Sequence, residues 1–140
     1  MNYKTISLAV ASALALTALT ASAEDKKLDA SKLPPSSDKK SVTYESDIKA
    51  IFEKSCVKCH SGEKAKSKLH LDSAEGAIKG GKEGPDIIVG KSGESPLVYS
   101  VAHVGDEEEF MPPPKNKANI PPLTKEQVGL IRAWIDQGAK

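Results

Sequence analysis

The sequence predicts a mainly α protein, with about four helices joined by long loops rich in glycine and proline. Four segments between residues 44 and 139 carry the apolar spacing and the capping residues of helices. No segment shows the long alternation of apolar and polar residues that a half-buried strand requires. We therefore expect one helical domain without a sheet.

The first 23 residues have the features of a secretory signal peptide. A start containing Lys4 precedes an apolar stretch at residues 6–20, and Ala21-Ser22-Ala23 resembles a cleavage site. The stretch is shorter than the roughly 20 apolar residues that span a bilayer. We expect cleavage after Ala23 and export, as to a periplasm, with no integral membrane segment after processing. An uncleaved N-terminal anchor is the alternative.

Residues 24–41 are polar and charged and include two prolines, so we expect a flexible linker there. Residues 42–140 remain as one domain. Removal of Lys4 leaves 19 basic and 19 acidic side chains, a balance that gives no global field to favour nucleic acid or an anionic membrane. The domain has few aromatic residues, so a large, flat, apolar cofactor would supply part of its core.

The first expected helix runs from Tyr44 to Ser55 and leads directly into Cys56. Four of its residues share one face because they fall at i, i+3, i+4 and i+7: Ile48, Ile51, Phe52 and Ser55. A second, shorter helix is expected after Asp72, whose carboxylate suits the N-cap while Glu75 reaches back. Gly80-Gly81 should stop it.

The third expected helix begins at Ser95-Pro96, a capping hydroxyl followed by a proline whose fixed φ suits the first helical position. Its predicted buried stripe contains Leu97, Val98, Val101 and Ala102, and Gly105 is expected to end it. The fourth has the clearest punctuation, because Thr124 and Gln127 form a capping box and Gly138 suits a left-handed C-terminal position. Its predicted inner face contains Val128, Ile131, Trp134 and Ile135.

The segment Cys56-Val57-Lys58-Cys59-His60 has the C-x-x-C-H spacing of c-type haem attachment. Two cysteines three positions apart lie on one side of a helical turn, where both sulfurs can form thioethers with one porphyrin. His60 would then be the proximal iron ligand. A redox dithiol, a disulfide, or a zinc site completed by His60, His70 or His103 are the competing interpretations.

Met111 is the only methionine left once Met1 is removed, and three prolines follow it. A thioether is a weak iron ligand that must be held in place, and a proline run restricts the loop strongly. We therefore predict Met111 as the sixth ligand, a pairing with histidine that raises the reduction potential. The alternatives are a packing role for Met111 and ligation by His103.

Two charged runs lie near these residues in sequence. Basic side chains surround the motif at Lys54, Lys58, Lys64, Lys66 and Lys68, and acidic ones precede Met111 at Asp106, Glu107, Glu108 and Glu109. One interpretation is a solvated surface, and the other is steering of a transient redox partner.

The sequence resembles the planctomycete-type cytochrome c domain, a branch of the class I cytochrome c fold, over residues 44–139. The resemblance rests on IFEKSCVKCHSGEKAKSKLHLDSAEGAIKGG, GPDIIVGKSGESPLV, MPP and LTKEQVGLIRAWIDQGA. It implies helices packed around one covalently bound haem c, with attachment at Cys56 and Cys59 and with His60 and Met111 as the two iron ligands.

The resemblance also implies that the first and last helices meet, with Phe52 and Trp134 at or near the contact. Pro85 is the nearest match to the proline whose carbonyl accepts from the proximal histidine in class I cytochromes. The expected function is single-electron transfer between redox proteins in the periplasm, which is the role of an electron carrier rather than of an enzyme. A haem sensor or small-ligand enzyme with an open sixth position is the alternative.

Overall fold

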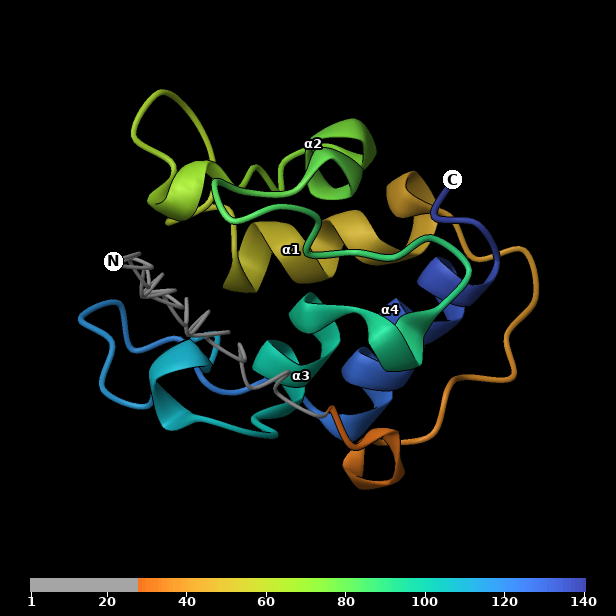
Figure 1. Cartoon of the computed structure of the whole chain (residues 1–140). Coiled ribbons are helices and arrows are strands. Elements are labelled where there is room, and N and C mark those ends of the chain that lie inside the picture. The colour runs from red at the N-terminus through yellow and green to blue at the C-terminus, as the bar shows by residue number, and fades with distance from the viewer. Residues whose placement is uncertain (1–27) are drawn as a thin grey trace, which may run out of the picture.

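The computed structural model describes residues 28–140, and within them the protein is mainly helical, as predicted. Its α-helices are α1 (Lys49–Ser55), α2 (Ala74–Lys79), α3 (Pro96–Ala102) and α4 (Lys125–Asp136). Short turns of 3₁₀ helix and long loops join them, and the described residues contain no strand (Figure 1). The predicted signal peptide, residues 1–23, lies outside the described residues.

Helix α1 continues directly from one turn of π-helix, Tyr44–Ile48, so the two together cover the predicted range. The hydroxyl of Thr43 caps this unit by accepting from the amide of Ser46 at 3.2 Å. The large apolar residues of the unit are buried: Tyr44, Ile48, Ile51 and Phe52. The unit ends where the cysteine motif begins, because Cys56 is the residue that follows α1.

Helix α4 confirms the predicted local signals. Thr124 and Gln127 form both bonds of the capping box, and Gly138 has a φ of +102°, in the left-handed region. The predicted inner face, which contains Val128, Ile131, Trp134 and Ile135, is almost wholly buried. Helix α4 contacts α3 on one side and the Tyr44–Ile48 turn on another, so it forms the centre of the core.

Two predicted helix ends are wrong in detail. The N-cap of α2 is Ser73 rather than Asp72, because the Ser73 hydroxyl accepts from Gly76 at 3.0 Å. Helix α3 ends at Ala102, before Gly105, since His103 adopts a left-handed conformation with φ of 53° and ψ of 47°. Histidine tolerates this conformation better than most side chains do.

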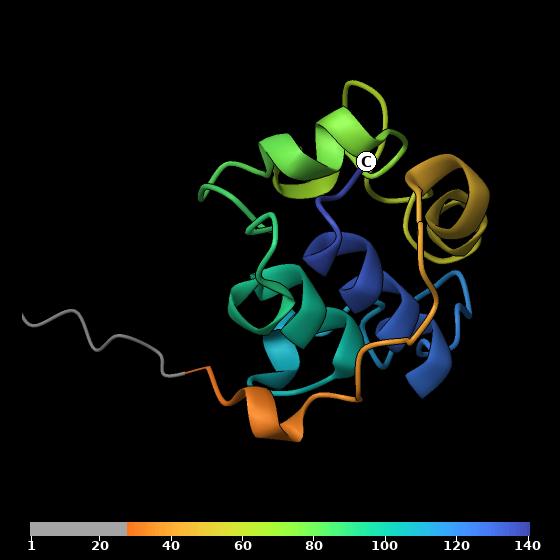
Figure 2. The same ribbon diagram turned by 90° about the vertical axis from the view of Figure 1, so that its right-hand side faces the viewer.

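Residues 33–42 run along α4 before the chain enters α1 (Figure 2). Ser37 donates its amide to the carbonyl of Gly129 at 2.9 Å, and Arg132 bonds to the carbonyl of Pro34. The amide of Val42 donates to Gln137 at 3.1 Å, and Leu33 is buried. We call residues 33–42 the strap. The composition of residues 24–41 predicted a flexible linker, yet this part of it is bonded to α4.

No helix within the part of the chain that the structure describes is long and apolar enough to cross a membrane. The longest of them, α4, has 12 residues.

Candidate haem site

The cysteine motif forms a tight turn at the end of α1. The amides of Cys59 and His60 both donate to the carbonyl of Cys56, each at 3.0 Å. This turn holds the two cysteines on one side of the chain, as the spacing predicted. Cys56 is buried, Cys59 is half-buried, and both thiols are free rather than joined in a disulfide.

The backbone around His60 is fixed by a bond from the amide of Leu71 to the His60 carbonyl at 2.8 Å. The Nδ1 atom of the His60 side chain is buried and has no hydrogen-bond partner among the described residues. Burial lowers the pKa of His60, while the nearby carbonyls of Lys66 and Leu69 oppose that shift without bonding Nδ1 in good geometry. The neutral imidazole, the form that binds a metal, is therefore favoured.

Pro85 was the expected acceptor for His60, and in this structure its carbonyl does not bond Nδ1. The carboxylate of Asp86, the next residue, accepts a hydrogen bond from the amide of Gly81 at 2.9 Å. Burial raises the pKa of Asp86, and its carboxylate in turn favours a proton on His60.

Met111 lies in the loop after α3, and this loop is bonded to the last turn of the helix. The amide of Met111 donates to the carbonyl of Ser100 at 3.0 Å. The side chain is partly buried and packs against the core. Met111 therefore sits at a fixed point of the backbone although three prolines, which lack N–H groups, follow it.

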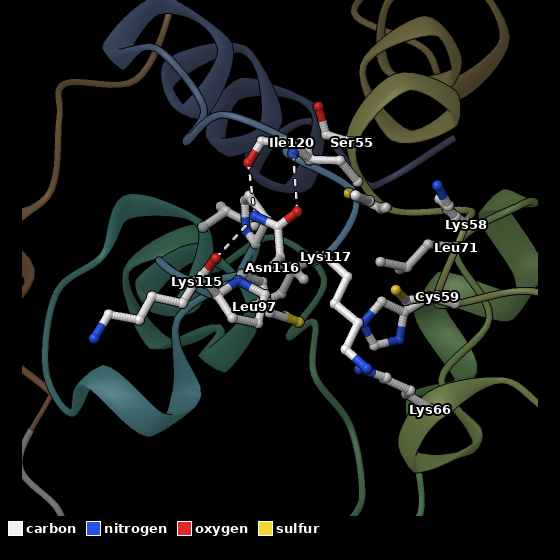
Figure 3. A pocket seen from close by; sticks show the side chains of 17 residues that line it. Ser55, Lys58, Cys59, Lys66, Leu71, Leu97, Lys115, Asn116, Lys117 and Ile120 are labelled. Atoms are coloured by element: carbon white, nitrogen blue, oxygen red, sulfur yellow. Dashed lines mark hydrogen bonds between the residues drawn. The ribbon is translucent and has the colours of Figure 1, made fainter.

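A single cavity of about 580 Å³ brings the four predicted residues together: Cys56, Cys59, His60 and Met111 all line it. One side carries residues of the motif and the loop after it, Lys58, Cys59, Lys66 and Leu71, and the opposite side carries Leu97, Lys115 and Asn116 (Figure 3). His70 and His103 are not among the lining residues. The structure thus separates the predicted residues from the rival histidines.

The cavity fits a large, mostly apolar cofactor that is attached through sulfur. Its volume lies within the range of about 300–1,000 Å³ that small-molecule and cofactor sites occupy. The walls are mainly apolar, and they also present two free thiols, a buried imidazole nitrogen without a partner and a thioether. Thiols, imidazole and thioether are the groups that attach and ligate a c-type haem.

The polar part of the lining is positively charged. It includes the four exposed lysines Lys58, Lys66, Lys115 and Lys117, and no acidic residue. We call these four the rim lysines. The sequence predicted basic residues near the motif, but Lys115 and Lys117 come from the loop after Met111, and only the fold brings them to the same opening.

Some lining residues were predicted for another reason, and others were missed, among them Asn116. Leu97 and Val101 were expected on the buried stripe of α3, and they form part of the cavity wall. Asn116 carried no sequence signal, since a lone asparagine in a polar loop is common. In the structure its side chain bonds the carbonyl of Pro113 and both backbone groups of Ile120, each at 2.9 Å (Figure 3).

A small helical domain whose cavity is lined by a C-x-x-C-H motif and a distant methionine is consistent with the cytochrome c class. Comparison with protein families gives the particular family, because residues 56–115 match the model described as Planctomycete cytochrome C. This part of the chain is thus similar to a planctomycete-type cytochrome c domain, a kind of domain that binds haem covalently. Neither the curated proteins nor the solved structures contain a match to this chain.

Proposed function

We propose that this protein is an exported monohaem electron carrier. Haem would be attached at Cys56 and Cys59, and His60 and Met111 would be the iron ligands. The observation that supports this most strongly is the single cavity that all four residues line, although Met111 is distant from the other three in sequence. The family match covers all four positions.

Each residue would have a distinct role. The two thiols would hold the cofactor covalently, so it would stay bound after export of the protein. The neutral imidazole of His60 and the thioether of Met111 would be the two protein ligands of the haem iron, which would leave no position for a substrate. When bound, haem would supply a one-electron ferric/ferrous couple for transfer between a donor protein and an acceptor.

The competing interpretations of the cysteine motif find less support. A redox dithiol needs a cysteine with a lowered pKa, whereas burial raises the pKa of Cys56 to about 12. Among residues 28–140 no group of three or more histidine, cysteine or acidic side chains is arranged to hold a metal ion. A zinc site at Cys56 and Cys59 would therefore lack its remaining ligands.

The rim lysines suggest how a partner is approached. Four exposed cations line the cavity, although the 19 basic and 19 acidic side chains of the chain without residues 1–23 balance as a whole. A local positive patch of this kind attracts an acidic partner and speeds its association, and salt weakens the effect. We propose that transient redox partners dock at this opening through acidic surfaces.

Visible spectra of protein purified from an exporting host, in both redox states, test the proposal together with the intact mass. We expect a processed chain carrying the mass of one haem and a reduced spectrum that carbon monoxide does not change. Rapid carbon monoxide binding would favour the open-site sensor or enzyme instead. A colourless protein without added mass would contradict haem attachment altogether.

The docking surface is tested with ferricyanide, an anionic oxidant, and the reduced protein in stopped flow. Lys66→Gln with Lys117→Gln should slow oxidation several-fold at low ionic strength, and added salt should remove the difference. Lys91→Gln is the matched control, because Lys91 lies outside the cavity lining. Equal rates for the double variant and the wild type would contradict docking at the rim lysines.

A further inference from the structure

The loop after Met111 has few backbone N–H groups with which to form hydrogen bonds. Pro112, Pro113 and Pro114 have no N–H to donate, so the loop depends on donors that reach its carbonyls from elsewhere. A weak thioether ligand needs a loop whose position is set before it binds, because ordering the loop on binding would cost affinity. The question is therefore which side chains supply those donors.

His103 contacts the residues on both sides of Met111. Its Nε2 lies 3.1 Å from the carbonyl oxygen of Pro112. Because a carbonyl oxygen only accepts, Nε2 carries the proton in this contact. The same ring stacks on Phe110, with centroids 4.5 Å apart and planes within 10°. One imidazole therefore holds the residue before Met111 and the residue after it.

The position of this imidazole is itself fixed by the end of α3. His103 has a left-handed backbone, and its amide donates to the carbonyl of Ser100. The carbonyl of Ser100 also accepts from the amide of Met111. The end of α3 therefore holds this loop twice, once through the bond from the Met111 amide to Ser100 and once through the contacts of the His103 side chain with Phe110 and Pro112.

Asn116 holds the next carbonyl of the loop. Its amide nitrogen donates to Pro113 at 2.9 Å, and the same side chain is anchored by two bonds to the backbone of Ile120. The carbonyls of Pro112 and Pro113 thus each receive one side-chain donor. His103 comes from the N-terminal side of the loop and Asn116 from its C-terminal side.

We propose that His103 and Asn116 are positioning residues that keep Met111 at the sixth coordination position, and that neither is itself a ligand. The proposal rests on the proposed ligation by Met111. It assigns His103 a role different from the rival ligand that the sequence suggested, because its Nε2 is engaged with Pro112 and the ring is outside the cavity lining.

Imidazole added to the ferric holoprotein tests this, because it binds iron only as fast and as tightly as the sixth position is released. Met111→Ala defines the fully open state. His103→Asn is the test variant, since asparagine tolerates the left-handed backbone but loses the ring and its reach. His70→Asn is the matched control at a half-exposed histidine outside the cavity lining.

We expect imidazole to bind His103→Asn at least tenfold more tightly than wild type, with His70→Asn within twofold of wild type. His103→Gln should bind imidazole more weakly than His103→Asn and closer to wild type, because the glutamine side-chain amide can place an N–H near the position of Nε2. Wild-type affinity in His103→Asn, with much tighter binding in Met111→Ala, would overturn the positioning role and leave ligation by Met111 intact.

Other outcomes separate the two proposals. Wild-type affinity in Met111→Ala would remove Met111 as ligand, and the positioning role would fall with it. In that case, an altered spectrum in His103→Asn alone would make His103 the ligand. If His103→Asn does not retain haem, Asn116→Ala decides by the same tenfold criterion. Its control is Asn119→Gly, which keeps the positive φ of Asn119.

Discussion

The ring of Phe52 on α1 meets the indole of Trp134 on α4 edge to face, with centroids 6.1 Å apart and planes at 89°. Tyr44 completes the cluster, 6.1 Å from Phe52 and 6.0 Å from Trp134. The contact shows that the first and last helices meet at the two residues that the family resemblance implied. Because α1 leads into Cys56, this cluster joins the end of the chain to the start of the cysteine motif.

Replacement of Trp134 by alanine should destabilise the holoprotein by about 3–5 kcal/mol, the usual cost of removing a large buried aromatic side chain. Trp134 is fully buried, and its Nε1 donates to the carbonyl of Lys140 at 3.0 Å. Urea unfolding followed by circular dichroism measures the change. Val89→Ala is the control, because Val89 is 47% exposed and its loss should cost less than about 0.5 kcal/mol.

Gly129→Ala should displace the strap from α4. A Cβ at Gly129 would lie 2.7 Å from the carbonyl oxygen of Pro35, closer than such atoms approach. We expect a loss of about 1–3 kcal/mol, typical of overpacking, and faster proteolysis of the strap. Gly93→Ala meets only the Cβ of Ala30 at 3.4 Å and serves as control. Equal protease resistance of Gly129→Ala and wild type would show that the strap can shift freely.

The carboxylate of Asp47 should contribute to stability in a pH-dependent way. Its bond with Lys39, and then the bond from the amide of Thr43, hold its pKa below the ordinary value of 3.8. The contribution is therefore present above that value and is lost as the pH falls through the lowered pKa. The stability difference between wild type and Asp47→Asn, measured by urea unfolding at several pH values, should shrink below pH 3.8.

Single replacement of Cys56 or Cys59 by alanine should leave haem held through one bond only, and replacement of both should abolish covalent retention. Cofactor and core should be lost together, since the cavity of about 580 Å³ would be left unfilled. Intact mass and the visible spectrum after denaturation report the attached haem. Ser55→Ala, adjacent to Cys56 and also in the cavity lining, is the control. Full covalent haem in the double variant would contradict the proposed attachment.

Met111→Ala should lower the reduction potential, by on the order of 0.1 V or more, because a thioether opposite histidine stabilises ferrous iron. Potentiometric titration with optical detection measures the shift. Leu97→Ala tests specificity, because Leu97 lines the same cavity and is an apolar wall residue. The proposed ligation predicts a much smaller shift for Leu97→Ala, and equal shifts in the two variants would contradict it.

Local sequence signals predicted the elements that depend on neighbours in the chain. The capping box of Thr124 and Gln127 formed as predicted because its two bonds join residues three positions apart. The error at α2 has the same origin, since Asp72 and Ser73 are adjacent candidates for one cap. Sequence alone does not decide which of two neighbouring polar side chains turns toward the helix.

The strap shows what composition leaves out. Residues 24–41 are too polar to form a core of their own, which predicted a flexible linker. Backbone groups of this segment bond to α4, at Gly129 and Arg132, and these bonds depend on where α4 lies rather than on apolar content. A polar segment held by such bonds looks the same in sequence as an unheld one.

By itself the sequence predicted the helices and the C-x-x-C-H turn, because these are set by spacing along the chain, and it made Met111 the candidate sixth ligand as the only methionine outside residues 1–23. Only the tertiary structure decided that Met111 shares a cavity with Cys56, that the rim lysines line the same cavity, and that His103 bonds the carbonyl of Pro112. These relationships join residues far apart in the chain, so they exist only once the helices have packed.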